Sequence, residues 1–145
     1  CTPNEIKRYT RKISGPLLDR IDIHVHVPRV KYEDMTSVAK AEPSAAIRAR
    51  VLAAREIQME RLKEWGIFCN AQMSHAILKK TCTLESEAQN LLAQAFQVMN
   101  LSARSYDRII KVARTIADLD GAATIEAKHV GEAIQLRDDV GLNVE

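Results

Sequence analysis

The sequence predicts a mainly α-helical protein: a bundle of four to five helices, preceded by a remnant strand and helix of a truncated α/β core. Three observations carry this prediction. Five glycines and four prolines among 145 residues are about half the usual share of turn formers, which favours long helices. Apolar residues recur at helical spacing after residue 44. A β-branched run of alternating polarity, typical of a strand, occurs once, at 21–27.

The first predicted unit is the end of the α/β core at residues 1–30. A polar helix is expected before the break at 14–16, and the strand at 21–27 follows it. A single strand cannot pair its own backbone groups, and no second strand pattern follows. We therefore expect the partner strands to lie outside this chain. The chain starts at Cys1 rather than Met, which also predicts a piece of a longer protein.

The remaining residues divide into a linker at 31–43, a helical domain at 44–138 and a frayed tail at 139–145. Within the helical domain the apolar spacing and the cap residues predict five segments. These expected helices cover residues 44–64, 74–80, 84–99, 103–119 and 125–137. The expected N-caps are Ser44, Thr83, Ser102 and Thr124. The segment at 103–119 has the clearest apolar face, and Gly121 stands where a helix-ending glycine belongs.

Composition and charge exclude several classes of protein. The net charge is +2 and the pI is about 8.5, far from the basic excess of a dedicated nucleic-acid-binding domain. No apolar run is long enough to span a membrane, and no secretory signal is present. Three widely spaced cysteines argue against a disulfide framework and for a reduced, cytoplasmic setting. Cys69 and Cys82 are interpreted as small buried hydrophobes.

No complete catalytic site can be assembled from the sequence. A phosphate-binding GxxxxGK[ST] loop, an HExxH motif and a nucleophile elbow are all absent. His24 and His26 share one face of the predicted strand and could ligate a metal, but no third ligand is obvious. We therefore interpret both histidines as part of a solvated face.

Two arginines are the candidate functional residues. Arg20 lies at the start of the predicted strand, where an α/β fold gathers ligands, and its fork can bind phosphate. The alternative is a salt bridge to Asp19 or Asp22. Arg104 lies in the first turn of its helix, where a cation opposes the helix dipole unless an anion binds there.

The alternative for Arg104 is an exposed side chain that pairs with Asp107, three residues later on the same helix. Arg108, Lys111 and Arg114 extend a basic stripe along that helix. We interpret the stripe as a solvated face rather than a nucleic-acid contact.

The chain resembles the magnesium chelatase-like AAA+ ATPases, most closely the ComM/YifB branch. The stretch at 11–22, Arg-Lys-Ile-Ser-Gly-Pro-Leu-Leu-Asp-Arg-Ile-Asp, is similar to the last segment of the family's core. The stretches at 69–73, 101–106, 112–119 and 129–135 are similar to its C-terminal lid domain. These motifs occur in the family's order and span nearly the whole chain.

The resemblance implies roles for three residues. Arg20 resembles the arginine finger, which reaches the γ-phosphate of ATP on a neighbouring subunit. Arg104 resembles the sensor 2 arginine, which reports the nucleotide state to the lid. Cys1 resembles the last cysteine of a cysteine-rich insertion, so a zinc site here would be incomplete and no complete metal site is expected. The family's Walker A and B motifs are missing from this chain, so the fragment alone is expected to be inactive.

For the full-length protein the resemblance implies ATP and Mg²⁺ as cofactors and a ring, with six subunits expected, as the assembly. The branch resembles DNA helicases of branch migration in competence, with DNA as a partner and no membrane contact. One alternative is the motor subunit of a true magnesium chelatase. Another is a stand-alone helical module that binds DNA or a protein, which the low net charge disfavours.

Overall fold

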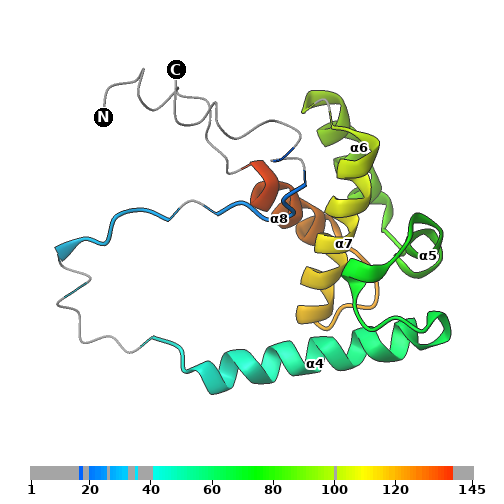
Figure 1. Cartoon of the computed structure of the whole chain (residues 1–145). Coiled ribbons are helices and arrows are strands. Elements are labelled where there is room, and N and C mark those ends of the chain that lie inside the picture. The colour runs from blue at the N-terminus through cyan, green and yellow to red at the C-terminus, as the bar shows by residue number, and fades with distance from the viewer. Residues whose placement is uncertain are drawn as a thin grey trace.

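A computed structural model describes residues 17, 20–25, 27–32, 35, 41–99 and 101–138. Over these residues the predicted mainly α-helical bundle is confirmed, with five α-helices and two short 3₁₀ helices (Figure 1). The α-helices are α4 (Ser44–Leu62), α5 (His75–Thr81), α6 (Ser86–Val98), α7 (Ala103–Leu119) and α8 (Ala127–Asp138). The 3₁₀ helices are η1 (Lys63–Trp65) and η2 (Asn70–Gln72). Cys1, His26, the expected helix before residue 14 and the tail at 139–145 lie outside the described residues.

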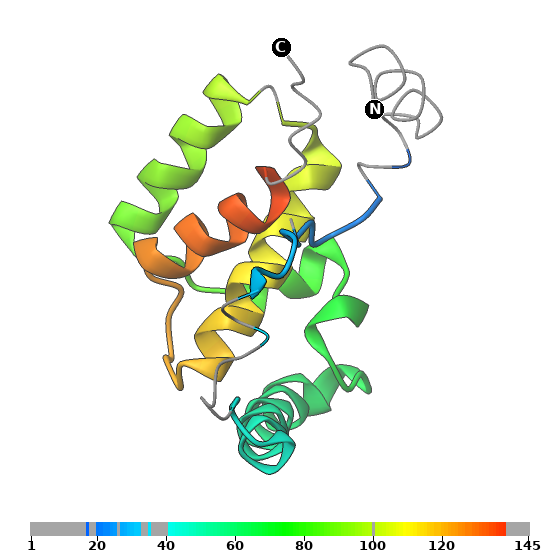
Figure 2. The same cartoon turned by 90° about the vertical axis from the view of Figure 1, so that its left-hand side faces the viewer.

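The bundle is organised around α7, which contacts α4, α5, α8 and η2, while α6 packs on α8 (Figure 2). The predicted apolar face of α7 is confirmed, because it supplies several of the most buried side chains of the core. Small residues on α6, α7 and α8 let these helices approach closely. The core residues with the least exposure include Leu62, Ala88, Ile109, Ile110, Ala113, Ala117, Ile125, Val130 and Ala133.

Both ends of α7 lie where the sequence predicts them. Ser102 is the N-cap, and its Oγ accepts a hydrogen bond from the Ser105 amide at 3.2 Å, which satisfies one donor of the first turn. Gly121 follows the helix with a φ of 68°, a conformation that glycine adopts without steric cost. The amide of Ala122 closes this end by donating to the Ala117 carbonyl at 2.8 Å.

Three of the predicted N-caps are wrong. Leu84 and Ile125 form a parallel β-bridge, so α6 and α8 each begin two residues later than expected. Backbone pairing there replaces a side-chain cap, and the Thr124 hydroxyl donates to Glu85 instead. Ser44 is the first residue of α4 and not its cap, because the cap position is Pro43, which has no side-chain donor or acceptor.

Helix α4 extends beyond the bundle (Figure 1). Its buried residues are Ala54, Gln58 and Leu62, all in its C-terminal half. The predicted end of this helix near residue 64 is confirmed, since η1 continues α4 for one turn and Gly66 follows with a φ of 64°. The N-terminal half of α4 therefore exposes apolar side chains such as Val51 and Leu52.

The strand predicted at 21–27 is not formed, and the described residues of that range have no regular secondary structure. Val25 is 65% exposed and Val27 is 82% exposed, as expected for a segment without a sheet to cover it. Instead of pairing with a strand, His24 donates its amide to the Leu136 carbonyl of α8 at 2.6 Å. A strand needs a neighbouring strand to satisfy its backbone, and the described part of the chain offers none.

Candidate functional site

Arg20 is exposed, and its amide donates to the Leu17 carbonyl at 3.0 Å. Its guanidinium forms no ion pair with any described residue. Asp22, one of the two carboxylates that could have held it, instead pairs with Arg108 at 2.5 Å. The other candidate, Asp19, lies outside the described residues. The Arg20 side chain therefore projects a charge that the described carboxylates do not neutralise.

Arg104 is the second residue of α7 and is exposed. It does not pair with Asp107, because Asp107 Oδ1 lies 2.7 Å from His75 Nδ1. Among the described residues no carboxylate holds the Arg104 guanidinium. The side chain thus stands at the positive end of the α7 dipole, a position that is unfavourable for a cation unless an anion shares it.

Replacing Arg104 by alanine is expected to raise the free energy of unfolding by about 0.3–1 kcal/mol at low ionic strength, because it removes this repulsion. The gain is expected to shrink in high salt. Urea unfolding of the two proteins at low and high salt measures both effects. Lys79→Ala is the matched control of opposite sign, since Lys79 lies in the last turn of α5, where a cation is favourable. A loss of stability in Arg104→Ala would show that the side chain has a stabilising contact.

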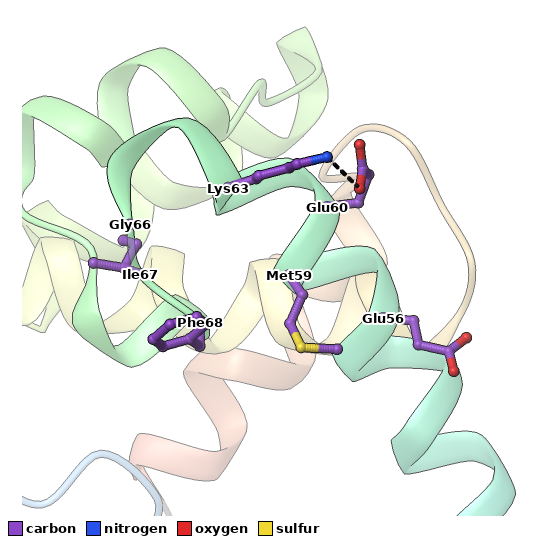
Figure 3. Close-up of a pocket in the computed structure, with 7 residues that line it drawn as sticks. All are labelled: Glu56, Met59, Glu60, Lys63, Gly66, Ile67 and Phe68. Atoms are coloured by element: carbon purple, nitrogen blue, oxygen red, sulfur yellow. Dashed lines mark ion pairs between the residues drawn. The ribbon is translucent and has the colours of Figure 1, made fainter.

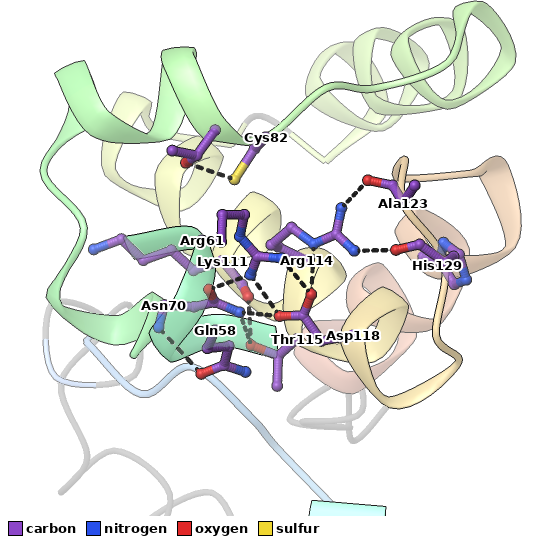
Figure 4. Close-up of polar contacts among 12 residues, drawn as sticks. Gln58, Arg61, Asn70, Cys82, Lys111, Arg114, Thr115, Asp118, Ala123 and His129 are labelled. Carbon is purple, nitrogen blue, oxygen red and sulfur yellow. Dashed lines mark hydrogen bonds and ion pairs between the residues drawn. The ribbon is translucent and has the colours of Figure 1, made fainter. Parts of the chain in front are cut away.

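A buried ionic cluster joins α4, η2 and α7 (Figure 4). Asp118 Oδ1 and Oδ2 accept from the two terminal nitrogens of Arg61 at 2.6 and 2.7 Å. Arg114 Nε donates to Asp118 Oδ1 at 3.0 Å, and Asn70 Nδ2 donates to Oδ2 at 2.8 Å. Arg114 is 1% exposed and Asp118 is 2% exposed. One buried carboxylate thus binds two guanidinium groups, of which that of Arg114 is buried and that of Arg61 is partly exposed.

The interpretation of Arg114 as part of a solvated stripe is therefore wrong. Besides Asp118, Arg114 binds the Ala122 and Ala123 carbonyls at 2.5 and 2.9 Å, which fixes the loop after α7. Burial lowers the pKa of the Arg114 guanidinium, and the nearby Asp118 charge opposes that shift. An arginine stays charged at neutral pH in spite of such a shift. Lys111 is also engaged, because its Nζ donates to the Ala71 carbonyl at 3.1 Å.

A cavity of about 590 Å³ lies beside the C-terminal end of α4 (Figure 3). Met59, Ile67 and Phe68 supply its apolar wall, and Glu56 and Glu60 stand at its edge. Its one basic residue, Lys63, lies 3.8 Å from the Glu60 carboxylate. Neither Arg20 nor Arg104 lines this cavity. Its lining lacks the converging cations that a nucleotide phosphate chain needs.

The cysteines and histidines do not form a metal centre in the part of the chain that the structure describes, since no three His, Cys, Asp or Glu residues gather there. Cys82 is buried, as predicted, and burial raises the pKa of its thiol. Cys69 is half-exposed rather than buried, because it lies in the turn before η2, with Sγ 3.5 Å from Gln72 Oε1. None of the described helices is long and apolar enough to cross a bilayer.

His24 and His129 are both held by backbone groups. His24 Nδ1 lies 2.9 Å from the Arg137 carbonyl, so this nitrogen carries a proton and donates. His129 Nδ1 accepts from the Glu126 amide at 3.0 Å, and Nε2 lies 3.1 Å from Asp120 Oδ2. Lys128 also pairs with Asp120, and these two hydrogen bonds lower the pKa of that carboxyl.

The fold defines a small all-α domain of the lid type, and the two candidate arginines, Arg20 and Arg104, are exposed outside its core. Comparison with known families gives the class its name. The family described as "Magnesium chelatase, subunit ChlI C-terminal" matches residues 41–137, and "Magnesium chelatase, subunit ChlI" matches residues 1–35. The chain therefore belongs to the magnesium chelatase-like family.

Relatives of the ComM/YifB branch are similar over most of the chain. Competence protein ComM of Haemophilus influenzae is 38% identical over 137 residues, which cover 94% of this chain. The uncharacterized protein YifB of Escherichia coli is 37% identical over 138 residues, again 94% of the chain. The chain spans 26% of the length of each of these relatives. The resemblance to the ComM/YifB branch is confirmed.

Proposed function

We propose that this chain is part of a subunit of an ATP-driven ring. Residues 44–138 form the lid domain of that subunit, and residues 1–30 form the end of its ATPase core. Arg20 is the arginine finger that acts on a neighbouring subunit, and Arg104 is the sensor 2 residue of its own subunit. The observation that carries the proposal is the state of the two guanidinium groups. Both are exposed, and the described carboxylates nearest to them in sequence, Asp22 and Asp107, are held by Arg108 and His75.

The chemistry expected of Arg20 is charge stabilisation. As ATP is cleaved, negative charge spreads over the oxygens of the transferred phosphoryl group, and a positioned guanidinium lowers the energy of that transition state. A planar fork with several N–H donors suits these oxygens. The residues that hold ATP and Mg²⁺ belong to the segment with the Walker motifs, which is absent from this sequence.

The chemistry expected of Arg104 is different. Its side chain is exposed at the N-terminal end of α7, beside the amides of the first turn. A phosphate bound there would remove the repulsion between the arginine and the helix dipole. The lid would thus have a higher affinity for a subunit with a full phosphate chain than for an empty one. This differential affinity is what a nucleotide sensor requires.

For the whole protein we favour a cytoplasmic DNA motor of competence, built as a ring with six subunits as the expected number. The similarity to a protein named for competence supports this choice. A motor subunit of a true magnesium chelatase is the second candidate, and the family's own description favours it. A stand-alone DNA-binding module is disfavoured, since Arg114 is buried and Lys111 is bonded, which interrupts the basic stripe on α7.

An ATPase and strand-unwinding assay on the full-length protein tests the proposal. Hydrolysis is expected in the full-length protein, with stimulation by branched or single-stranded DNA, and no turnover is expected from residues 1–145 alone. Turnover by the isolated chain would reveal a site that the sequence motifs miss. Stimulation by a tetrapyrrole-binding partner instead of DNA would favour the chelatase motor. A full-length protein that neither binds nor hydrolyses ATP would contradict both.

A further inference from the structure

The first turn of α7 is fixed by hydrogen bonds between the serines on either side of Arg104. Ser102 Oγ accepts from the Ser105 amide at 3.2 Å. It also lies 3.0 Å from Ser105 Oγ, with which it shares a second hydrogen bond. Ser105 is 2% exposed, so water does not compete for these contacts. The backbone of Arg104 is therefore held, while its side chain is exposed.

Arg137, in the last turn of α8, extends this network to a second helix. Its Nη2 donates to Ser105 Oγ at 3.1 Å, across 32 residues of sequence. Because the donor carries a full charge, such a hydrogen bond is stronger than one between two neutral groups. The half-buried Arg137 thus ties the first turn of α7 to the last turn of α8.

These contacts lie within the lid and use no residue of the preceding segment. Ser102, Ser105 and Arg137 all fall inside 41–137, the range that matches the family's C-terminal model. The segment at 1–35, which matches the other model, takes no part in them. Helices α7 and α8 also share the core of the bundle, where Ile109 and Val130 are at most 2% exposed. The tie to the Arg104 turn is therefore built into the bundle itself.

The direction of the Arg104 side chain depends on how the backbone of this turn is held. The first turn of α7 contains no acidic residue, and Asp107, the described carboxylate nearest in sequence, binds His75. No described carboxylate therefore fixes the Arg104 guanidinium, and its backbone aims it. A displacement of about 1 Å at a group that binds a reacting phosphate can cost about 100-fold in rate. A firm first turn is thus a requirement for any phosphate contact by Arg104.

We propose that Arg137 is a positioning residue for Arg104. By holding Ser105 it fixes the first turn of α7, so that the Arg104 guanidinium meets the terminal phosphate of a bound nucleoside triphosphate. The inference rests on the proposed function, in which Arg104 is the sensor 2 residue. A nucleoside diphosphate lacks the terminal phosphate. Arg137 therefore acts on the preference of the subunit for ATP over ADP without touching the nucleotide.

Hydrogen exchange of the full-length protein, followed by mass spectrometry, tests the contact itself. In Arg137→Ala, peptides that cover residues 103–108 are expected to exchange at least about tenfold faster than in the wild type, because the first turn of α7 loses its tie to α8. Ser105→Ala removes the acceptor and is expected to have the same effect. Arg137→Lys keeps a charged donor and is expected to restore slow exchange in part. Arg48→Ala, which changes an exposed arginine of α4, is the matched control and is expected to leave exchange unchanged. Unchanged exchange in Arg137→Ala would overturn the inference.

Equilibrium binding of the ATP analogue ATPγS and of ADP to the full-length protein tests whether Arg137 acts through Arg104. Arg137→Ala is expected to weaken the binding of ATPγS about tenfold and that of ADP less than about twofold, because only the triphosphate reaches the displaced Arg104. The double variant Arg104→Ala with Arg137→Ala is expected to bind ATPγS as weakly as Arg104→Ala alone. A residue that acts through another adds nothing once the other is gone.

The same measurements separate the ways in which the inference can fail. An equal loss of ATPγS and ADP affinity in Arg137→Ala would show a merely structural role and overturn it. Additive losses in the double variant would overturn it as well, because Arg137 would then act independently of Arg104. A loss in Arg104→Ala without one in Arg137→Ala would overturn it and leave the proposed function standing. Wild-type affinities in Arg104→Ala would contradict the proposed role of Arg104 and, with it, this inference.

Discussion

Replacing Asp118 by asparagine is expected to lower the free energy of unfolding by about 3–5 kcal/mol, the usual cost of breaking a buried ion pair by removing one partner. Asparagine keeps the shape of the side chain but loses the charge that neutralises Arg61 and Arg114. Its amide hydrogens would also face N–H donors at the place where a carboxylate oxygen now accepts. A domain has about 5–15 kcal/mol of stability in total, so this loss is a large part of it.

Urea unfolding, followed by circular dichroism, measures this effect. The matched control is Glu60→Gln, which removes the charge from an ion pair with Lys63 whose side chains are 81% and 74% exposed. That change is expected to shift stability by less than about 1 kcal/mol, because water screens the pair. Equal effects for the buried and the exposed carboxylate would mean that the Asp118 cluster does not hold α4 against α7.

The largest expected effect on activity comes from Arg20→Ala in the full-length ring. Arginine fingers contribute about 10³–10⁵ to the rate of phosphoryl transfer, so kcat is expected to fall by roughly that factor. Nucleotide affinity is expected to survive, because the finger acts on the transition state of a neighbouring site. Stability is expected to stay within about 0.5 kcal/mol of the wild type, since the side chain is exposed and has no described ion pair.

Steady-state hydrolysis together with equilibrium binding of a nucleotide analogue separates these effects. Arg29→Ala is the matched control, an exposed arginine nine residues further along the same segment, and its activity is expected to match the wild type. A parallel loss of binding and turnover in Arg20→Ala would point to a structural role. Near-normal turnover would remove Arg20 from the mechanism.

The sequence predicts α7 well because its local signals agree. Ser102 as a cap, a continuous apolar face and Gly121 after the last turn all favour the same helix, and the structure has it at Ala103–Leu119. The starts of α6 and α8 were predicted two residues early because Thr83 and Thr124 look like caps. The backbone beside these threonines instead forms the β-bridge between Leu84 and Ile125. Sequence spacing gives no sign of a pairing between residues so far apart.

The prediction that Arg114 lies on a solvated face was wrong because it relied on the charge of the residue. Its place four residues after Ile110 puts it on the apolar face of α7, and periodicity alone would have buried it. Its charge favoured the surface instead. What the sequence of α7 cannot show is Arg61, a partly buried guanidinium brought to Asp118 from α4, 57 residues away. The ion pair between Arg108 and Asp22 spans 86 residues and was missed for the same reason.

The prediction of a strand at 21–27 is wrong for a different reason. Its alternating pattern is typical of a strand within a sheet. Such a pattern determines the structure of a segment when a neighbouring strand is present to pair with it. In the described part of this chain the same residues are held by α7 and α8 instead. Tertiary partners, and not local propensity, decide the structure of such a segment.

The claim that Arg20 acts on the ATP of a neighbouring subunit is tested most directly by mixing two inactive forms of the full-length protein. One form carries Arg20→Ala, and the other has a disabled nucleotide-binding segment but an intact Arg20. In a ring with head-to-tail interfaces, the ATP site of the first form can lie opposite the Arg20 of the second. The account predicts that the mixture regains partial hydrolysis. A mixture no more active than the two forms measured separately would contradict it.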